Sequence, residues 1–208
     1  MKPKAAYCTS RLLAAAVLGS ASLCLSSALS ATEHPAREAQ TGAAEMEARW
    51  LEFQQALLPE IAVRLGEKFQ RDYPHGQHRQ AGMKILEDAR KAFRAQQEAR
   101  LSTEALDDPA GDGTYRDDLV KALRADKDAA YRIALMYRQG THRLAKDSLR
   151  STQWLRLAAE LGNGRASWEV ANVYNRDGEM AEAARFEAKA VRDGFRIPPR
   201  LPNRGLTN

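Results

Sequence analysis

The strongest constraint on the fold is a pattern that occurs twice in the second half of the chain, 37 residues apart. Ala129, Ile133 and Tyr137 recur as Ala166, Val170 and Tyr174, and Ala134 recurs as Ala171. Within each copy the residues are three or four positions apart, which is the spacing of one face of an α-helix. A repeat of this length is typical of stacked helix pairs, in which each pair buries its apolar face against the next.

The same region carries a wider set of small, aromatic and capping residues at regular spacings. These positions are Ala129, Ile133, Ala134, Tyr137, Gly140, Asp147, Trp154, Ala158, Ala159, Gly162, Asn163, Ala166, Val170, Ala171 and Tyr174. The set resembles the SEL-one-like repeat (SLR), a subclass of tetratricopeptide-like helical repeats. The resemblance covers one full unit and most of a second, roughly residues 117–194. Ala134 and Ala171 replace a glycine of the family pattern, and Phe186 stands where a second tryptophan would map.

Helical periodicity also dominates the first half of the chain. Apolar residues recur every three or four positions over residues 46–69 and again over residues 83–93. Residues 43–106 are therefore predicted to form a long helical hairpin, with Pro59 kinking or restarting the first helix. Strand-like alternation is missing. The predicted fold class is all-α, a hairpin followed by about two helix-pair repeats that form a short α-solenoid.

Five shorter helices are expected in the repeat region, residues 115–195. They lie near residues 115–125, 127–139, 147–161, 164–176 and 179–193.

Three segments lack the helical pattern. Residues 32–42 are polar and predicted to be flexible, and residues 107–114 form a linker rich in Asp and Gly. Thr114 or Asp117 is expected to cap the helix that follows the linker. Residues 196–208 contain three prolines and are predicted to be a disordered tail.

Residues 1–31 have the layout of a secretory signal peptide. Basic residues are followed by the uncharged apolar run Leu12–Leu25 and by small residues up to Ala31. We therefore expect export, with cleavage, to the periplasm of a Gram-negative bacterium. The alternative is an N-terminal anchor in the inner membrane, because the uncharged stretch Leu12–Ala31 is long enough to cross a bilayer.

The predicted leader also changes the charge and the cysteine content. The whole chain has 32 Lys and Arg against 27 Asp and Glu, a net charge of +5, but three of the basic residues lie in the leader. The mature chain is therefore close to neutral, which does not indicate binding to nucleic acid. Both cysteines, Cys8 and Cys24, are in the leader, so a cysteine-free mature chain without disulfides or a thiol nucleophile is predicted.

The resemblance implies a concave surface, lined by the first helix of each pair, that holds a peptide or a partner protein. With Ile133 and Tyr137 in the core, the opposite faces of these helices carry aromatic, Asn and Arg side chains that suit peptide capture. The candidate groove residues are Tyr131, Leu135, Arg138, Arg165, Trp168, Asn172, Asn175 and Arg176. The alternative is that Tyr131 and Trp168 pack beneath the hairpin, which would fill the groove.

Metal binding and catalysis have little support in the sequence. His75 and His78 lack the further ligands that a metal needs. The segment from Asp108 has Ala110 and Leu119 where a calcium loop needs oxygen ligands. We therefore predict a non-catalytic interaction module, without metal or cofactor, that binds a protein or peptide of the cell envelope. The alternative is an enzyme that acts on peptidoglycan or a related polymer with carboxylates as acid and base.

Overall fold

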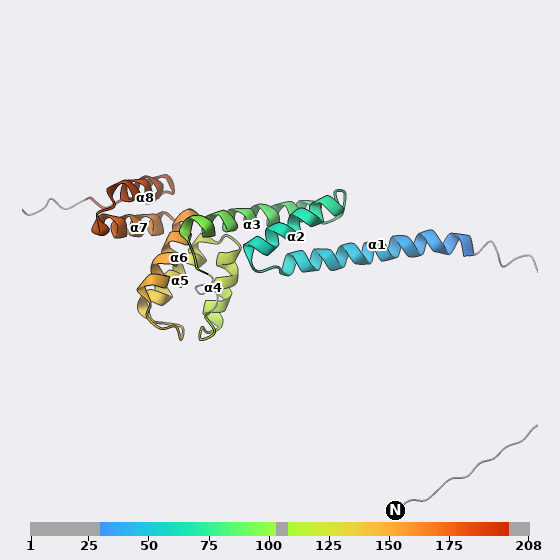
Figure 1. Cartoon of the computed structure of the whole chain (residues 1–208), viewed down its shortest axis with the longest axis horizontal. Helices are drawn as coiled ribbons and strands as arrows, with labels where there is room; N and C mark the ends of the chain where they lie inside the picture. Colours follow the sequence, from blue (N-terminus) through green and yellow to red (C-terminus); the bar gives the residue numbers. More distant parts are fainter. Residues whose placement is uncertain (1–29, 103–107, 200–208) are drawn as a thin grey trace, which may run out of the picture. The chain divides into compact units, whose positions relative to one another are not determined.

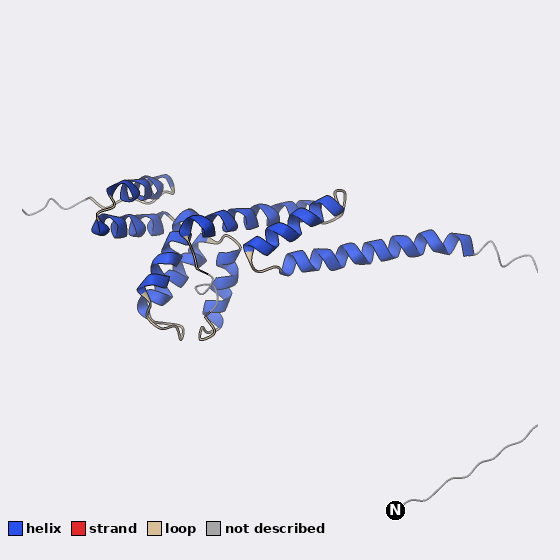
Figure 2. Ribbon diagram, in the orientation of Figure 1, coloured by secondary structure: helices blue, strands red, loops and turns tan. Residues whose placement is uncertain are grey.

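The computed structural model describes residues 30–102 and 108–199, with side-chain environments from residue 40 onward. This part of the chain contains eight helices and no strand (Figures 1 and 2), so the all-α prediction is confirmed. The predicted signal peptide up to residue 29, with both cysteines, lies outside the described residues. Residues 103–106 of the predicted hairpin, residue 107 of the predicted linker and residues 200–208 of the tail also lie outside the described residues.

Helix α1 (Ser30–Gln55) is the first helix of the described residues. It includes residues 32–42, for which we expected a flexible segment. Ala, Glu, Gln and Arg make up much of this stretch, and these residue types favour helix. None of the helices described is long and apolar enough to span a membrane.

Helices α2 (Pro59–Asp72) and α3 (Arg79–Ala99) lie side by side as the predicted hairpin (Figure 1). Pro59 begins α2, where the missing N–H of proline needs no partner. Helix α3 ends earlier than the sequence indicated, because Arg100 adopts a left-handed conformation with a φ of 52°. The last turns of α1 complete the hydrophobic core of the hairpin, because Trp50 and Phe53 of α1 pack around Phe69 of α2.

The next five helices fall within two residues of their predicted positions. They are α4 (Gly113–Leu123), α5 (Lys127–Gln139), α6 (Ser148–Glu160), α7 (Gly164–Asp177) and α8 (Met180–Arg192).

Side-chain caps explain where four of these helices begin. Asp112, Asp126, Asp147 and Asn163 each accept a hydrogen bond from a backbone N–H of the first turn of α4, α5, α6 and α7. The expectation that Thr114 or Asp117 caps α4 is wrong, because the Asp112 carboxylate occupies that role, 3.1 Å from the Tyr115 nitrogen.

Neighbouring helices pack in pairs around one continuous core. α5 packs on α6 and α7 on α8, while α6 also contacts α7 and α4 contacts α5. The repeated small and aromatic residues are inside: Ala129, Ile133, Ala134, Tyr137, Trp154, Ala158, Ala159, Ala166, Val170 and Ala171 are 0% exposed, and Tyr174 is 8% exposed. Gly140 and Gly162, with φ of 69° and 98°, provide the left-handed residues that end α5 and follow α6.

The hairpin joins the repeat region through α3, which packs on α6 and to a smaller extent on α4. Ala95 and Ala99 of α3 are buried in the repeat core. Small residues at these two positions let the axes of α3 and α6 approach closely, so the hairpin covers the α6 side of the repeat region.

Candidate functional site

A groove of about 400 Å³ lies between α6 and α7, which we call the α6–α7 groove. Ser148, Ser151, Thr152 and Leu155 of α6 line one wall. The opposite wall consists of Glu169, Asn172, Val173 and Arg176 of α7, and Arg138 of α5 also lines the groove.

A second groove, of about 470 Å³, lies between α4 and α5 and is called the α4–α5 groove. Helix α4 contributes Thr114, Asp118 and Lys121. Helix α5 contributes Arg132, Leu135, Met136 and Gln139, and the loop after α5 adds Thr141 and His142.

The two grooves are related by the 37-residue repeat. A shift of 37 residues takes six lining residues of the α4–α5 groove onto six lining residues of the α6–α7 groove. The pairs are Thr114 with Ser151, Asp118 with Leu155, Arg132 with Glu169, Leu135 with Asn172, Met136 with Val173, and Gln139 with Arg176. Helix α4 therefore stands in the same relation to α5 as α6 does to α7.

The sequence interpretation missed this role of α4, although two signals for it were present. Asp126 precedes Asn163 by 37 residues, and both cap the following helix. Ala122, 1% exposed, likewise precedes the fully buried Ala159.

Helix α5 supplies an arginine to each groove, and a carboxylate of a neighbouring helix holds each one. Arg132 donates to both oxygens of Asp118, from Nε at 2.9 Å and from Nη2 at 2.6 Å. These bonds raise the pKa of the Arg132 guanidinium above its usual value. Asp118 is only 5% exposed, so the pair fixes the Arg132 side chain against α4.

On the other side of α5, Glu169 accepts hydrogen bonds from two side chains. The Tyr131 hydroxyl donates to Oε1 at 2.6 Å, and Arg138 Nη1 donates to Oε2 at 2.6 Å. Arg165 lies 3.4 Å from the same carboxylate and 5.6 Å from the centre of the Tyr131 ring. Burial and the bond to Glu169 raise the pKa of Tyr131, so this hydroxyl remains a donor.

Each groove also contains a cation that has no ion-pair partner among the residues described. These cations are Lys121 of α4 and Arg176 of α7. Asn172 lies one turn before Arg176 on the same wall. The grooves therefore combine fixed ion pairs with an exposed positive charge and a side-chain amide, which is Gln139 in the α4–α5 groove and Asn172 in the α6–α7 groove.

The structure places six of the eight predicted groove residues in or beside the grooves. Arg138, Asn172 and Arg176 line the α6–α7 groove, and Leu135 lines the α4–α5 groove. Tyr131 and Arg165 lie at the edge, around Glu169.

Two predicted residues have other contacts. The half-buried Trp168 stacks on Phe195, with ring centroids 6.4 Å apart and planes inclined by 25°. Asn175 donates to Glu187 of α8 at 3.1 Å.

Asp118, Arg132 and Glu169 were not among the predicted residues. Arg132 and Glu169 are opposite charges at equivalent repeat positions, which is the signal that could have found them.

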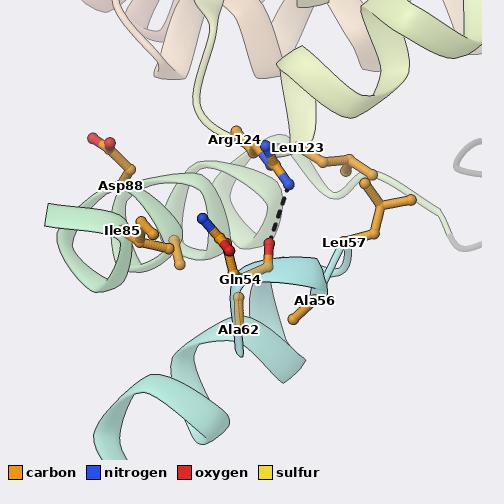
Figure 3. Close-up of a pocket in the computed structure, with 9 residues that line it drawn as sticks. Gln54, Ala56, Leu57, Ala62, Ile85, Asp88, Leu123 and Arg124 are labelled. Atoms are coloured by element: carbon orange, nitrogen blue, oxygen red, sulfur yellow. Dashed lines mark hydrogen bonds between the residues drawn. The ribbon is translucent and has the colours of Figure 1, made fainter. Parts of the chain in front are cut away.

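A smaller hollow, of about 150 Å³, lies where the hairpin meets α4 (Figure 3). Its walls are mainly apolar and include Leu57, Ile85 and Leu123. At its rim Arg124 Nη2 donates to the backbone oxygen of Gln54 at 3.2 Å. Gln54 and Asp88 also line this hollow, and its one guanidinium, that of Arg124, is already bonded to the end of α1.

The two histidines considered as metal ligands have separate environments. His78 stacks flat on Trp50, with centroids 4.5 Å apart, and its Nε2 lies 2.9 Å from Glu47 Oε1, whereas His75 is exposed. In the part of the chain that the structure describes, no three His, Cys, Asp or Glu side chains gather as a metal would need.

One pair of carboxyl groups meets outside the grooves. Glu98 of α3 is hydrogen-bonded to Glu160 of α6, which raises the pKa of Glu98 above its usual value. The Glu160 side chain is 3% exposed and forms ion pairs with Lys189 and Arg185 of α8. This junction connects the hairpin with both repeat pairs.

Comparisons of the chain with models of protein families, with curated proteins and with solved structures found no match. The resemblance to SEL-one-like repeats therefore remains a prediction from the residues named above.

Proposed function

We propose that this protein is an exported, non-catalytic adaptor that binds an extended peptide segment of a cell-envelope protein across the two grooves. The observation that carries the proposal is the 37-residue equivalence of the α4–α5 and α6–α7 grooves. Grooves that recur with a structural repeat suit a ligand that is itself a chain, because consecutive parts of an extended peptide can occupy equivalent positions.

The chemistry of the groove walls favours a peptide with acidic side chains. Asn172 can exchange hydrogen bonds with an extended backbone, and Arg176 and Lys121 can each pair with a carboxylate. The arginines of α5 are already held by Asp118 and Glu169, so little side-chain freedom is lost when a ligand binds.

The proposal also includes the type of helical repeat and the export of the protein. We interpret α4–α8 as a short solenoid of SEL-one-like repeats, and residues 1–31 as a cleaved signal peptide. Expression in a Gram-negative host followed by N-terminal sequencing tests export. A mature chain in the periplasmic fraction that begins near Ala31 or Thr32 supports it, and a full-length chain in the membrane fraction supports the anchored alternative.

An envelope enzyme is the second candidate, and it would need two carboxylates converging in a cleft. The carboxylates in the two grooves are each bound to an arginine. The Glu98–Glu160 pair faces Lys189 and Arg185 at a helix junction and lines none of the hollows described above. These environments favour binding over acid–base catalysis.

Selection from a library of displayed random peptides, followed by calorimetric titration of the best binder, tests the adaptor proposal. We expect the double variant Asn172→Ala/Arg176→Ala to bind at least about tenfold more weakly, as loss of charge-assisted hydrogen bonds predicts. Arg116→Ala is the matched control, because Arg116 is an exposed arginine of α4 that lines neither groove. Equal affinity of the double variant and the wild type would overturn the proposal.

A further inference from the structure

Each groove is lined by a column of three side chains on one of its two helices. Residues three and four positions apart lie on the same face of a helix. The α5 column of the α4–α5 groove consists of Arg132, Leu135 and Gln139. The shift of 37 residues gives the equivalent α7 column of the α6–α7 groove, which consists of Glu169, Asn172 and Arg176.

The first residue of each column is held by other side chains of the protein. Two hydrogen bonds fix Arg132 to Asp118 of α4. Tyr131 and Arg138 of α5 both donate to the Glu169 carboxylate. Because these groups already have partners, they form fixed parts of the groove walls and offer no free charge to a ligand.

The other two residues of each column differ in chemistry between the grooves. Leu135 and Gln139 are uncharged, whereas Asn172 and Arg176 are an amide and a cation. Leu135 and Asn172 are half-buried, and Gln139 and Arg176 are exposed. In the part of the chain that the structure describes, none of the three polar side chains has a hydrogen-bond or ion-pair partner.

The neighbours of the two middle residues show what each column favours. Met136, 6% exposed, lines the α4–α5 groove next to Leu135, so the two side chains form one apolar surface. In the α6–α7 groove Asn172 stands in the place of Leu135, one turn before Arg176. An amide and a guanidinium one turn apart suit a peptide backbone and a carboxylate beside it.

We propose that the two columns select different residues of the bound peptide, an apolar side chain at the α5 column and an acidic side chain at the α7 column. The inference rests on the proposed function and adds its specificity: the ligand is an extended peptide in which an apolar and an acidic position are separated along the chain. Lys121 lies on the α4 wall, outside the α5 column, and pairs with a carboxylate that neighbours the apolar residue.

Both columns also act against the wrong side chain. A carboxylate placed against Leu135 and Met136 loses water and gains no partner from the α5 column. An apolar side chain placed on the α7 column leaves Asn172 and Arg176 covered without a ligand partner. Specificity therefore comes from a penalty for the wrong residue as well as from contacts with the correct one.

The test exchanges the columns. Leu135→Asn/Gln139→Arg gives the α5 column the side chains of the α7 column, and Asn172→Leu/Arg176→Gln makes the reverse change. Displayed random peptides are selected on the full chain, as wild type and as each double variant, and then sequenced.

We expect the wild type to enrich one apolar and one acidic position. The variant of the α5 column should enrich acidic residues in place of the apolar ones, and the variant of the α7 column should enrich apolar residues in place of the acidic ones. A peptide selected by the wild type should bind either variant at least about tenfold more weakly. Leu149→Asn, at a position 69% exposed on α6 that lines neither groove, is the matched control and should enrich the same residues as the wild type.

Circular dichroism and thermal unfolding verify that the variants fold, and the two exchanges lie on different helices, so either one alone tests the inference. If a folded variant enriches the same residues as the wild type, its column does not set specificity and the inference is overturned, while peptide binding stands. If the wild type enriches no peptide, the adaptor proposal fails and the inference fails with it.

Discussion

Substitutions in the Asp118–Arg132 ion pair should lower the free energy of unfolding by different amounts, because the two side chains differ in burial. Asp118 is 5% exposed, whereas the Arg132 side chain is 45% exposed. Arg132→Ala leaves a nearly buried carboxylate without its partner, and we expect it to lower the free energy of unfolding by about 3 kcal/mol, the lower limit for breaking a buried pair. Asp118→Ala leaves an arginine that water can reach, and we expect a loss of about 1 to 2 kcal/mol.

The assay is urea unfolding of the wild type, both single variants and the double variant. The double variant should lose less than the sum of the single losses, with a coupling of about 1 to 2 kcal/mol, because the second substitution removes the group that the first left unpaired. Asp117→Ala, at the exposed neighbouring position of α4, corrects for helix propensity. Equal losses for the two single variants, or strict additivity, would show that α4 is not held to α5 by this pair.

Three further outcomes are expected. The Glu98–Glu160 hydrogen bond raises the pKa of Glu98. The contribution of protonated Glu98 to the stability of the fold is therefore complete below the ordinary carboxyl pKa and is lost as the pH rises through the raised pKa. Glu98→Gln, which keeps a donor, should therefore flatten the pH dependence of unfolding over that range, and an unchanged profile would contradict this. Gly164→Ala should destabilise by about 1 to 3 kcal/mol in thermal unfolding, since its Cβ would lie 3.0 Å from the Ala190 oxygen and the Phe195 Cβ. Gly113→Ala, which meets open space, should be neutral or slightly stabilising. Ile133→Ala, at a site that is 0% exposed, should lower the free energy of unfolding by about 2 to 5 kcal/mol in urea titrations, and a smaller loss would place Ile133 outside the core.

Helix positions were largely predictable because they depend on local signals. The caps Asp126, Asp147 and Asn163 and the left-handed glycine Gly140 mark helix ends directly in the sequence. The early end of α3 at Ala99 was not predictable, because the left-handed residue there is an arginine, a type that rarely takes this conformation.

The groove residues were only partly predictable. Periodicity shows which face of a helix is polar, but it does not show which residues of other helices contact that face. Arg138 and Arg176 look alike in the sequence, yet Arg138 is held by Glu169 while Arg176 has no ion-pair partner among the residues described. Trp168 matches Tyr131 in the repeat, but its ring is stacked by Phe195, which follows α8. Such differences depend on long-range neighbours.

The two equivalent grooves are proposed to bind one continuous peptide. A photoreactive amino acid placed at Leu135 or at Asn172 tests it directly when the selected peptide is added and the crosslinked sites are found by mass spectrometry. If one peptide occupies both grooves, both positions crosslink to it, at residues separated along its length. The same substitution at the exposed Leu149, the control, does not crosslink. Crosslinking from only one groove, or equally from Leu149, would contradict it.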